Sequence, residues 1–183
     1  MILAILLLII LLGGKYIKKR IELSLYPQKY TEYVEKYCKE FDVEPNLIYA
    51  VMKTESSFKP DAVSNVGARG LTQMMETTFD WVKGKLGDGD EVTYDSMFDP
   101  EMNIRYGTYL VGYLMHEFGN VEAAISAYHA GRGKVHEWLE DPNYSSDGVT
   151  LTDIPIKDTK HHVDKVKKAL AIYNELYQSG GTK

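Results

Sequence analysis

The residue with the clearest chemical potential in this chain is Glu55, a carboxylate near the end of a predicted amphipathic helix. The apolar stripe of that helix covers residues 47–52, and Glu55 lies on the turn that follows. A carboxyl group in an apolar setting has a raised pKa and can hold a proton near neutral pH. A glycine-framed segment over residues 70–73 would let backbone approach a ligand closely. This arrangement suits general-acid chemistry on a glycosidic bond.

Size and charge narrow the classes of function. The chain has 183 residues, 44% of them hydrophobic and 26% charged, which suits one globular domain with an appendage. Residues 1–20 hold four basic and no acidic residues, whereas residues 21–183 hold 17 basic and 26 acidic ones. We expect no nucleic-acid partner, because nucleic-acid binding needs a basic face that neutralises phosphates.

The N-terminus predicts a membrane segment. Residues 2–12 are an unbroken apolar run, followed by Gly13, Gly14 and a basic flank at residues 15–20. The run is short for a bilayer core of about 30 Å, and a cleaved signal peptide is the alternative. We favour an uncleaved hydrophobic anchor helix over residues 1–20, with a catalytic domain over residues 21–183.

Helical periodicity dominates the rest of the chain, so the predicted fold class is all-α. Proline and glycine positions set most of the expected helix ends, with Pro45 and Pro100 at helix starts and Gly119 after a helix end. The sequence predicts seven helices, over residues 27–41, 45–57, 76–86, 100–118, 121–129, 134–139 and 158–177. Residues 148–154 leave room for a small hairpin.

Four segments occur in an order and spacing typical of one family: residues 55–58, 67–74, 103–110 and 127–131, with the sequences ESSF, GARGLTQM, NIRYGTYL and AYHAG. Together they resemble the soluble lytic transglycosylases of glycoside hydrolase family 23. The resemblance covers residues 27–178. It implies a lysozyme-like α domain that cleaves the peptidoglycan glycan strand between N-acetylmuramic acid and N-acetylglucosamine, with no metal or cofactor.

The resemblance also implies how one carboxylate suffices. Most glycosidases use two, but the nearest second candidate, Asp61, follows Pro60 and is typical of a turn. In this family the acid, here Glu55, protonates the scissile oxygen and then takes the proton of the muramoyl 6-hydroxyl, which closes a 1,6-anhydro ring. By motif position, the substrate-binding residues are Ser64, Gln73, Met75, Tyr128 and His129.

Some positions depart from the family pattern. Thr72 stands where Met is usual and His129 where Asn is usual, while Asp158 and His162 replace Glu and Tyr. Adjacent histidines at 161 and 162 point about 100° apart on a helix, which is poor geometry for a shared metal. We therefore expect them to be solvated on the helix face.

The expected setting is the bacterial cell envelope, with the catalytic domain outside the cytoplasm and a secretion or conjugation machine as a conceivable partner. The basic flank after the apolar run conflicts with this orientation, because basic residues tend to stay on the cytoplasmic side. Two other functions stay open: a goose-type lysozyme that hydrolyses the same bond, and a non-catalytic wall-binding scaffold.

Overall fold

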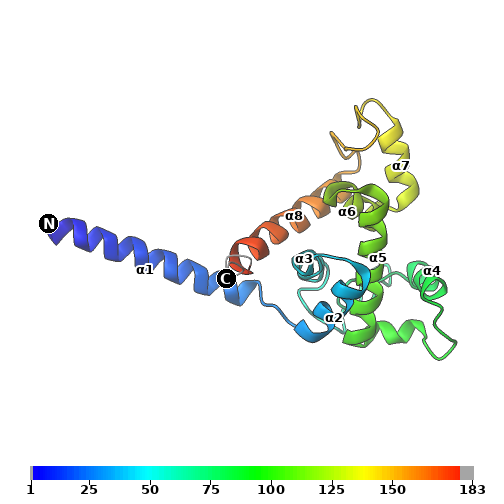
Figure 1. Ribbon diagram of the computed structural model, residues 1–183, viewed down its shortest axis with the longest axis horizontal. Coiled ribbons are helices and arrows are strands. Elements are labelled where there is room, and N and C mark those ends of the chain that lie inside the picture. The colour runs from blue at the N-terminus through cyan, green and yellow to red at the C-terminus, as the bar shows by residue number, and fades with distance from the viewer. Residues whose placement is uncertain (1, 178–183) are drawn as a thin grey trace.

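The computed structural model describes residues 2–177, with side chains from residue 13 onward. Within this range every regular element is helical (Figure 1), and the elements are α1 (Ile2–Leu25), α2 (Thr31–Phe41), α3 (Pro45–Glu55), α4 (Glu76–Leu86), the 3-10 helix η1 (Tyr94–Phe98), α5 (Pro100–Phe118), α6 (Val121–Ala130), α7 (Arg132–Glu140) and α8 (Lys157–Tyr177). The all-α prediction is confirmed.

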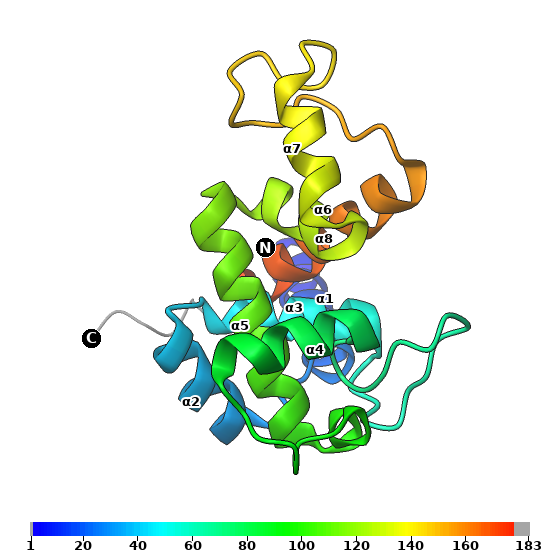
Figure 2. The same ribbon diagram turned by 90° about the vertical axis from the view of Figure 1, so that its right-hand side faces the viewer.

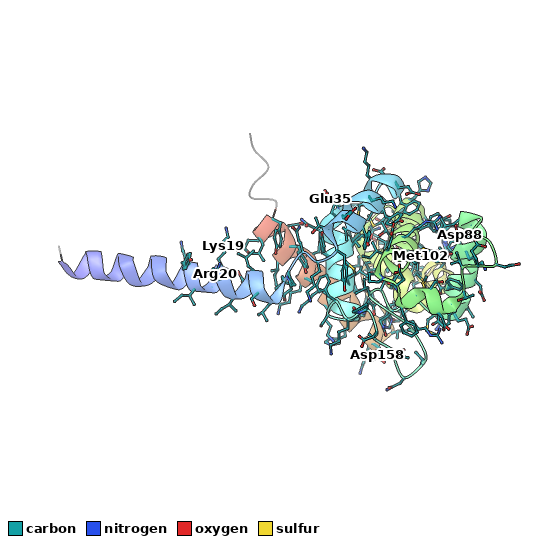
Figure 3. The ribbon with its side chains drawn as sticks, turned by 90° about the horizontal axis from the view of Figure 1, so that it is seen from below. Lys19, Arg20, Glu35, Asp88, Met102 and Asp158 are labelled. Carbon is teal, nitrogen blue, oxygen red and sulfur yellow. The ribbon has the colours of Figure 1, made fainter. Side chains whose placement is uncertain are left out.

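Helix α1 projects away from the body of the molecule and contacts α8 near the C-terminal end of that helix (Figure 1). Lys19 and Arg20 lie on this projecting part (Figure 3). Within residues 2–177, no helix reaches the length and apolarity that a membrane crossing requires. The expectation of a spanning anchor over residues 1–20 is thus not supported by the described part of the chain.

Helix α3 lies at the centre of the body. Its residues from Asn46 to Met52 are all buried, which is the pattern of a helix surrounded by others. It packs most extensively against α8 and also contacts α2 and α5. Because α3 is held on several sides, the position of its last residue, Glu55, is fixed by the core.

The local signals at helix ends were largely correct. Pro45 and Pro100 each occupy the first turn of a helix, and Gly119, with φ of 70°, ends α5. Helix α2 begins four residues after the predicted start at Pro27, because Tyr30 has left-handed backbone, with φ of 59°. That conformation interrupts a helix.

The predicted hairpin over residues 148–154 is wrong. The described chain has a single antiparallel bridge here, between Ser145 and Leu151, and no strand. The carboxylate of Asp147 accepts hydrogen bonds from the backbone N–H groups of Val149 and Thr150. This local turn takes up the donors that a ladder would need. Together with α7, the segment forms an arm that stands out from the body (Figures 1 and 2).

Candidate active site

Glu55 is the last residue of α3, and its side chain is only 16% exposed. Burial raises the pKa of its carboxyl to about 8, since a low-dielectric setting disfavours the charged form. At neutral pH the group is therefore mainly protonated. A protonated carboxyl that still reaches the surface is what general-acid catalysis requires.

The glycine-framed loop is fastened to the end of α3. The Ser56 hydroxyl donates to the Leu71 carbonyl across 2.8 Å. Directly after Ser56, both Ser57 and Phe58 have left-handed backbone, with φ of 51° and 64°. These two residues turn the chain sharply after Glu55, so that the loop returns beside the acid.

Asn103 on α5 holds the loop from the other side. Its fully buried side-chain oxygen accepts from the backbone N–H and the hydroxyl of Thr72, each at 2.8 Å. Its amide nitrogen donates to the carbonyls of Arg69 (3.1 Å) and Met97 (2.9 Å). Gly70 packs so tightly here that a Cβ would lie 2.1 Å from the Met97 oxygen. The loop is therefore rigid where it borders the acid.

Tyr128 links this loop to α6. Its hydroxyl donates to the carbonyl of Thr72. Burial raises the pKa of the phenol, and the charge of Glu55 raises it further, which places the two side chains within electrostatic reach of each other. Tyr128 therefore lies near Glu55, and its substrate-binding role stays a prediction.

Two histidines close the C-terminal side of the acid. The His162 Nε2 lies 3.3 Å from Glu55 Oε1, and its side chain is 11% exposed. The ring of His129 stacks on that of His162, with centroids 4.6 Å apart and planes at 27°. The His129 Nδ1 lies 3.1 Å from the Thr159 hydroxyl. The pair therefore joins α6 to α8 directly beside the carboxyl.

This arrangement corrects the expectation that both histidines are solvated. His161 is exposed, as expected, but His162 faces Glu55. Burial lowers the pKa of His162 to about 4, with contributions from His129, Lys165 and His161. Since Glu55 is mainly protonated and His162 is neutral at pH 7, their contact is not an ion pair at that pH.

A cavity of about 410 Å³ adjoins the acid. Its walls come from α4 and the residue before it, from α5 and α6, and from the start of α7, and in Figure 2 α4 and α6 lie one above the other with α5 beside them. Met75, Trp81, Tyr128, His129 and Arg132 are among its lining residues, whereas Glu55 is not. The cavity therefore lies next to the acid and shares two residues with its immediate surroundings.

The structure places the other three predicted binding residues differently from one another: Met75 lines the cavity, whereas Ser64 and Gln73 lie in the loop. Met75 is 38% exposed and lines the cavity. The Ser64 hydroxyl accepts from the backbone N–H of Ala68 at 3.0 Å, and the Gln73 amide donates to the carbonyls of Ala62 and Gly70. Ser64 and Gln73 thus hold the loop, and no described contact joins either of them to Glu55.

The sequence prediction missed three residues of this region. Thr159 is buried and contacts His129, His162 faces the acid, and Trp81 lines the cavity. Position 162 was visible as a departure from the family pattern, but helical periodicity alone does not show which face meets another helix. Trp81 carried no comparable signal. Among the described residues, no group of three or more His, Cys, Asp or Glu could hold a metal ion.

Comparison with known proteins points to one family. A family model described as the transglycosylase SLT domain matches residues 32–148. The soluble lytic murein transglycosylase of Salmonella typhimurium is 31% identical over 153 residues, which cover 82% of this chain and 24% of that protein. The membrane-bound lytic murein transglycosylase C of Serratia proteamaculans is 32% identical over 169 residues, covering 79% of this chain and 46% of that protein.

Solved structures that match this chain are lytic transglycosylases as well. The 70-kDa soluble lytic transglycosylase of Escherichia coli matches with a TM-score of 0.72 at 26% identity, covering 82% of this chain and 25% of that one. An inactive Glu-to-Gln mutant of the lytic transglycosylase Slt from Pseudomonas aeruginosa matches with the same TM-score and identity, covering 86% of this chain and 25% of that one. The chain spans about a quarter of these soluble proteins. It belongs to the lysozyme-like transglycosylase SLT domain family.

Proposed function

We propose that this chain is a peptidoglycan lytic transglycosylase in which Glu55 is the only catalytic carboxylate. The observation that carries the proposal is the buried Glu55 carboxyl, with a pKa of about 8, beside a rigid loop and a cavity. The relatives are named as lytic murein transglycosylases, and one solved relative is an inactive Glu-to-Gln mutant.

The reaction moves one proton out of Glu55 and one back. The protonated carboxyl gives its proton to the oxygen between N-acetylmuramic acid and N-acetylglucosamine, and the bond from that oxygen to the muramoyl C1 breaks. The carboxylate then takes the proton of the muramoyl 6-hydroxyl, whose oxygen bonds to C1. No water is consumed, and the tethered hydroxyl has the entropic advantage of an intramolecular nucleophile.

A single carboxylate is consistent with the electrostatics of the site. Burial is the one resolved cause of the Glu55 pKa shift among the described residues. A second carboxylate close to Glu55 would add a repulsive charge and a further shift. Asp61, the nearest in sequence, is exposed in a turn. We therefore assign Glu55 both the acid and the base step.

The cavity supports a glycan-binding role for Met75, Tyr128 and His129, which line it. For Ser64 and Gln73 we propose contact with the sugar through the loop that they hold in shape. Residues 21–183 form the catalytic domain in this proposal. Aromatic and amphipathic side chains such as Tyr128 suit a wet, sugar-binding groove.

We further propose that residues 1–20 keep the protein at a membrane, with the catalytic domain in the cell envelope. The apolar run at residues 2–12 supports this, as does the name of the membrane-bound relatives. A secretion or conjugation machine that needs a local opening in the wall is a suitable partner for such an enzyme.

The direct test is digestion of purified peptidoglycan by the wild type and by Glu55→Gln. We expect the variant to lose about 10²- to 10⁴-fold in rate, the usual contribution of general acid–base catalysis. Glu40→Gln, which changes an exposed glutamate on α2, is the matched control and should keep wild-type activity. Full activity of Glu55→Gln would refute the assignment.

A further inference from the structure

We propose that His162 is a positioning residue for Glu55. The Nε2–H of His162 donates a hydrogen bond to the Glu55 carboxylate that exists between the two proton transfers. This inference rests on the proposed transglycosylase function, because the carboxylate in question is the one that Glu55 becomes after it protonates the glycosidic oxygen and before it takes the proton of the 6-hydroxyl. The motif residues assigned above do not include position 162, and the role follows from where the structure places that side chain.

The first support is an unsatisfied buried nitrogen. The His162 Nε2 is buried without a hydrogen-bond partner, although Glu55 Oε1 is only 3.3 Å away. Buried polar atoms in native proteins nearly always have hydrogen-bond partners, so a buried nitrogen that faces a carboxyl without bonding to it needs an explanation. When Glu55 gives up its proton, its oxygen becomes a stronger acceptor, and a small movement would form the bond.

The second support is that the imidazole is held in place. The His129 ring covers one face of it, and the His129 Nδ1 is itself fixed by the buried hydroxyl of Thr159. These contacts join α6 and α8 across the acid, while Glu55 comes from α3. A donor held by packing is already oriented and loses little entropy when the bond forms.

The third support is charge. The groups that face His162 are Glu55 on α3, His129 on α6, and His161 and Lys165 on α8, with Asp158 acting on His129. Burial, with smaller contributions from His129, Lys165 and His161, lowers the pKa of His162 and keeps its ring neutral at pH 7. A neutral imidazole can stabilise the Glu55 carboxylate without taking the proton that the glycosidic oxygen needs. Because Nε2 is the ring nitrogen that faces Glu55 Oε1, we assign the proton of the neutral ring to Nε2.

Three variants separate a donor from a packing residue. His162→Gln keeps an N–H near the position of Nε2, His162→Asn carries the same amide one methylene shorter, and His162→Phe fills the space with no donor. A charged hydrogen bond of this kind corresponds to about 10- to 100-fold in rate. We expect His162→Asn and His162→Phe to lose that much in kcat on soluble glycan strands with KM nearly unchanged, and His162→Gln to stay within a few-fold of wild type.

The pH profile is the readout that packing alone would not move. Activity needs protonated Glu55, so it falls on the alkaline side as Glu55 ionises. Removing a donor to the carboxylate raises the pKa of Glu55, which should shift the alkaline limb of the profile to higher pH in His162→Asn and His162→Phe but not in His162→Gln. An unshifted limb in His162→Asn and His162→Phe, or equal losses of activity in all three variants, would overturn the proposal.

A second measurement is independent of activity. Carbon-13 NMR titration of the Glu55 carboxyl in the full chain should give a higher pKa in His162→Asn and His162→Phe than in the wild type and His162→Gln. An unchanged Glu55 pKa in both His162→Asn and His162→Phe would overturn the role of His162 even if the enzyme is active. A wild type inactive on peptidoglycan would count against the proposed function, whereas the titration would still decide about His162. If His162→Phe fails to fold, the pair His162→Gln and His162→Asn still gives both the pH profile and the Glu55 pKa.

Discussion

Burial changes what Glu55 can do. An ordinary glutamate has a pKa of 4.5, whereas the carboxyl at the end of α3 has a pKa of about 8. Helix α3 is packed on several sides, and the loop of residues 61–75 returns beside its end. Burying this carboxyl is unfavourable, and the packing of the rest of the fold offsets that free energy. The buried carboxyl is in return a protonated donor at neutral pH.

This shift predicts a pH dependence of stability. Because the folded pKa is raised, the native state binds the proton more tightly than the unfolded state between about pH 4.5 and pH 8. The stability of the wild type should therefore be full below pH 4.5 and decrease as the pH rises to about 8. Glu55→Gln cannot ionise, so it should be the more stable protein at pH 8 by a few kcal/mol, at about 1.4 kcal/mol per pKa unit.

Urea denaturation at pH 4.5 and pH 8 would measure the difference. The exposed Glu40→Gln should show no such divergence from the wild type. If the free energies of unfolding of Glu55→Gln and wild type stay parallel over this range, then Glu55 ionises as an ordinary surface carboxyl and cannot be the acid.

The sequence could identify Glu55 because its apolar stripe and its motif are local. It could not place His162, since that requires knowing that α8 crosses α3 and α6 at this point. The same limit applies to Thr159 and Trp81, which become part of the region only through contacts between distant helices. Ser64 and Gln73 were expected to face the substrate, and their described contacts are with the loop itself.

At the scale of elements, the loop between α3 and α4 depends on one glycine. Gly70 has φ of +75°, and a Cβ there would lie 2.1 Å from the Met97 oxygen and 2.2 Å from the Asn103 amide. Both the backbone conformation and the space exclude a side chain. The loop keeps its shape beside Glu55 because α5 and η1 close over this position.

Gly70→Ala should therefore destabilise the protein by about 3 kcal/mol or more, from backbone strain plus the clash. Gly67→Ala is the matched control, because Gly67 also has positive φ, +87°, but open space around it; it should cost only about 1 kcal/mol. Thermal unfolding of both variants checks this. Equal losses would show that the close approach of Met97 and Asn103 does not matter.

Helix ends were predictable to the extent that their causes are local. Pro45, Pro100 and Gly119 set ends that the structure confirms. The start of α2 was placed too early because the left-handed backbone at Tyr30 has no proline or glycine to signal it. The segment after α7 resembles a hairpin in sequence because a turn that Asp147 closes with its own side chain uses the same residue types as a hairpin turn.

At the scale of the whole molecule, α1 stands apart from an acidic body. The last part of α1 carries exposed apolar side chains at Tyr16, Ile17, Ile21 and Leu25 and a basic cluster at residues 15–20. Figure 3 shows Lys19 and Arg20 on this helix and Asp158 on the body. Basic residues near a membrane surface add about 1 kcal/mol each with anionic lipids.

Replacing Lys15, Lys18, Lys19 and Arg20 with Gln should weaken binding to phosphatidylglycerol vesicles by at least about tenfold. Co-sedimentation of the full chain with the vesicles measures it, and vesicles of neutral lipid are the control. Replacement of four exposed body lysines should leave binding unchanged. Unaltered binding of the α1 variant would mean that the basic flank plays no part in membrane association.

The most direct test of the central claim is the mass of the products released from peptidoglycan by the wild-type protein. If the muramoyl 6-hydroxyl attacks C1, each new end is a 1,6-anhydro sugar, lighter by one water than a reducing end. We predict anhydro products from the wild type and almost none from Glu55→Gln. Products with intact reducing ends would show that water is the nucleophile and would contradict the transglycosylase mechanism.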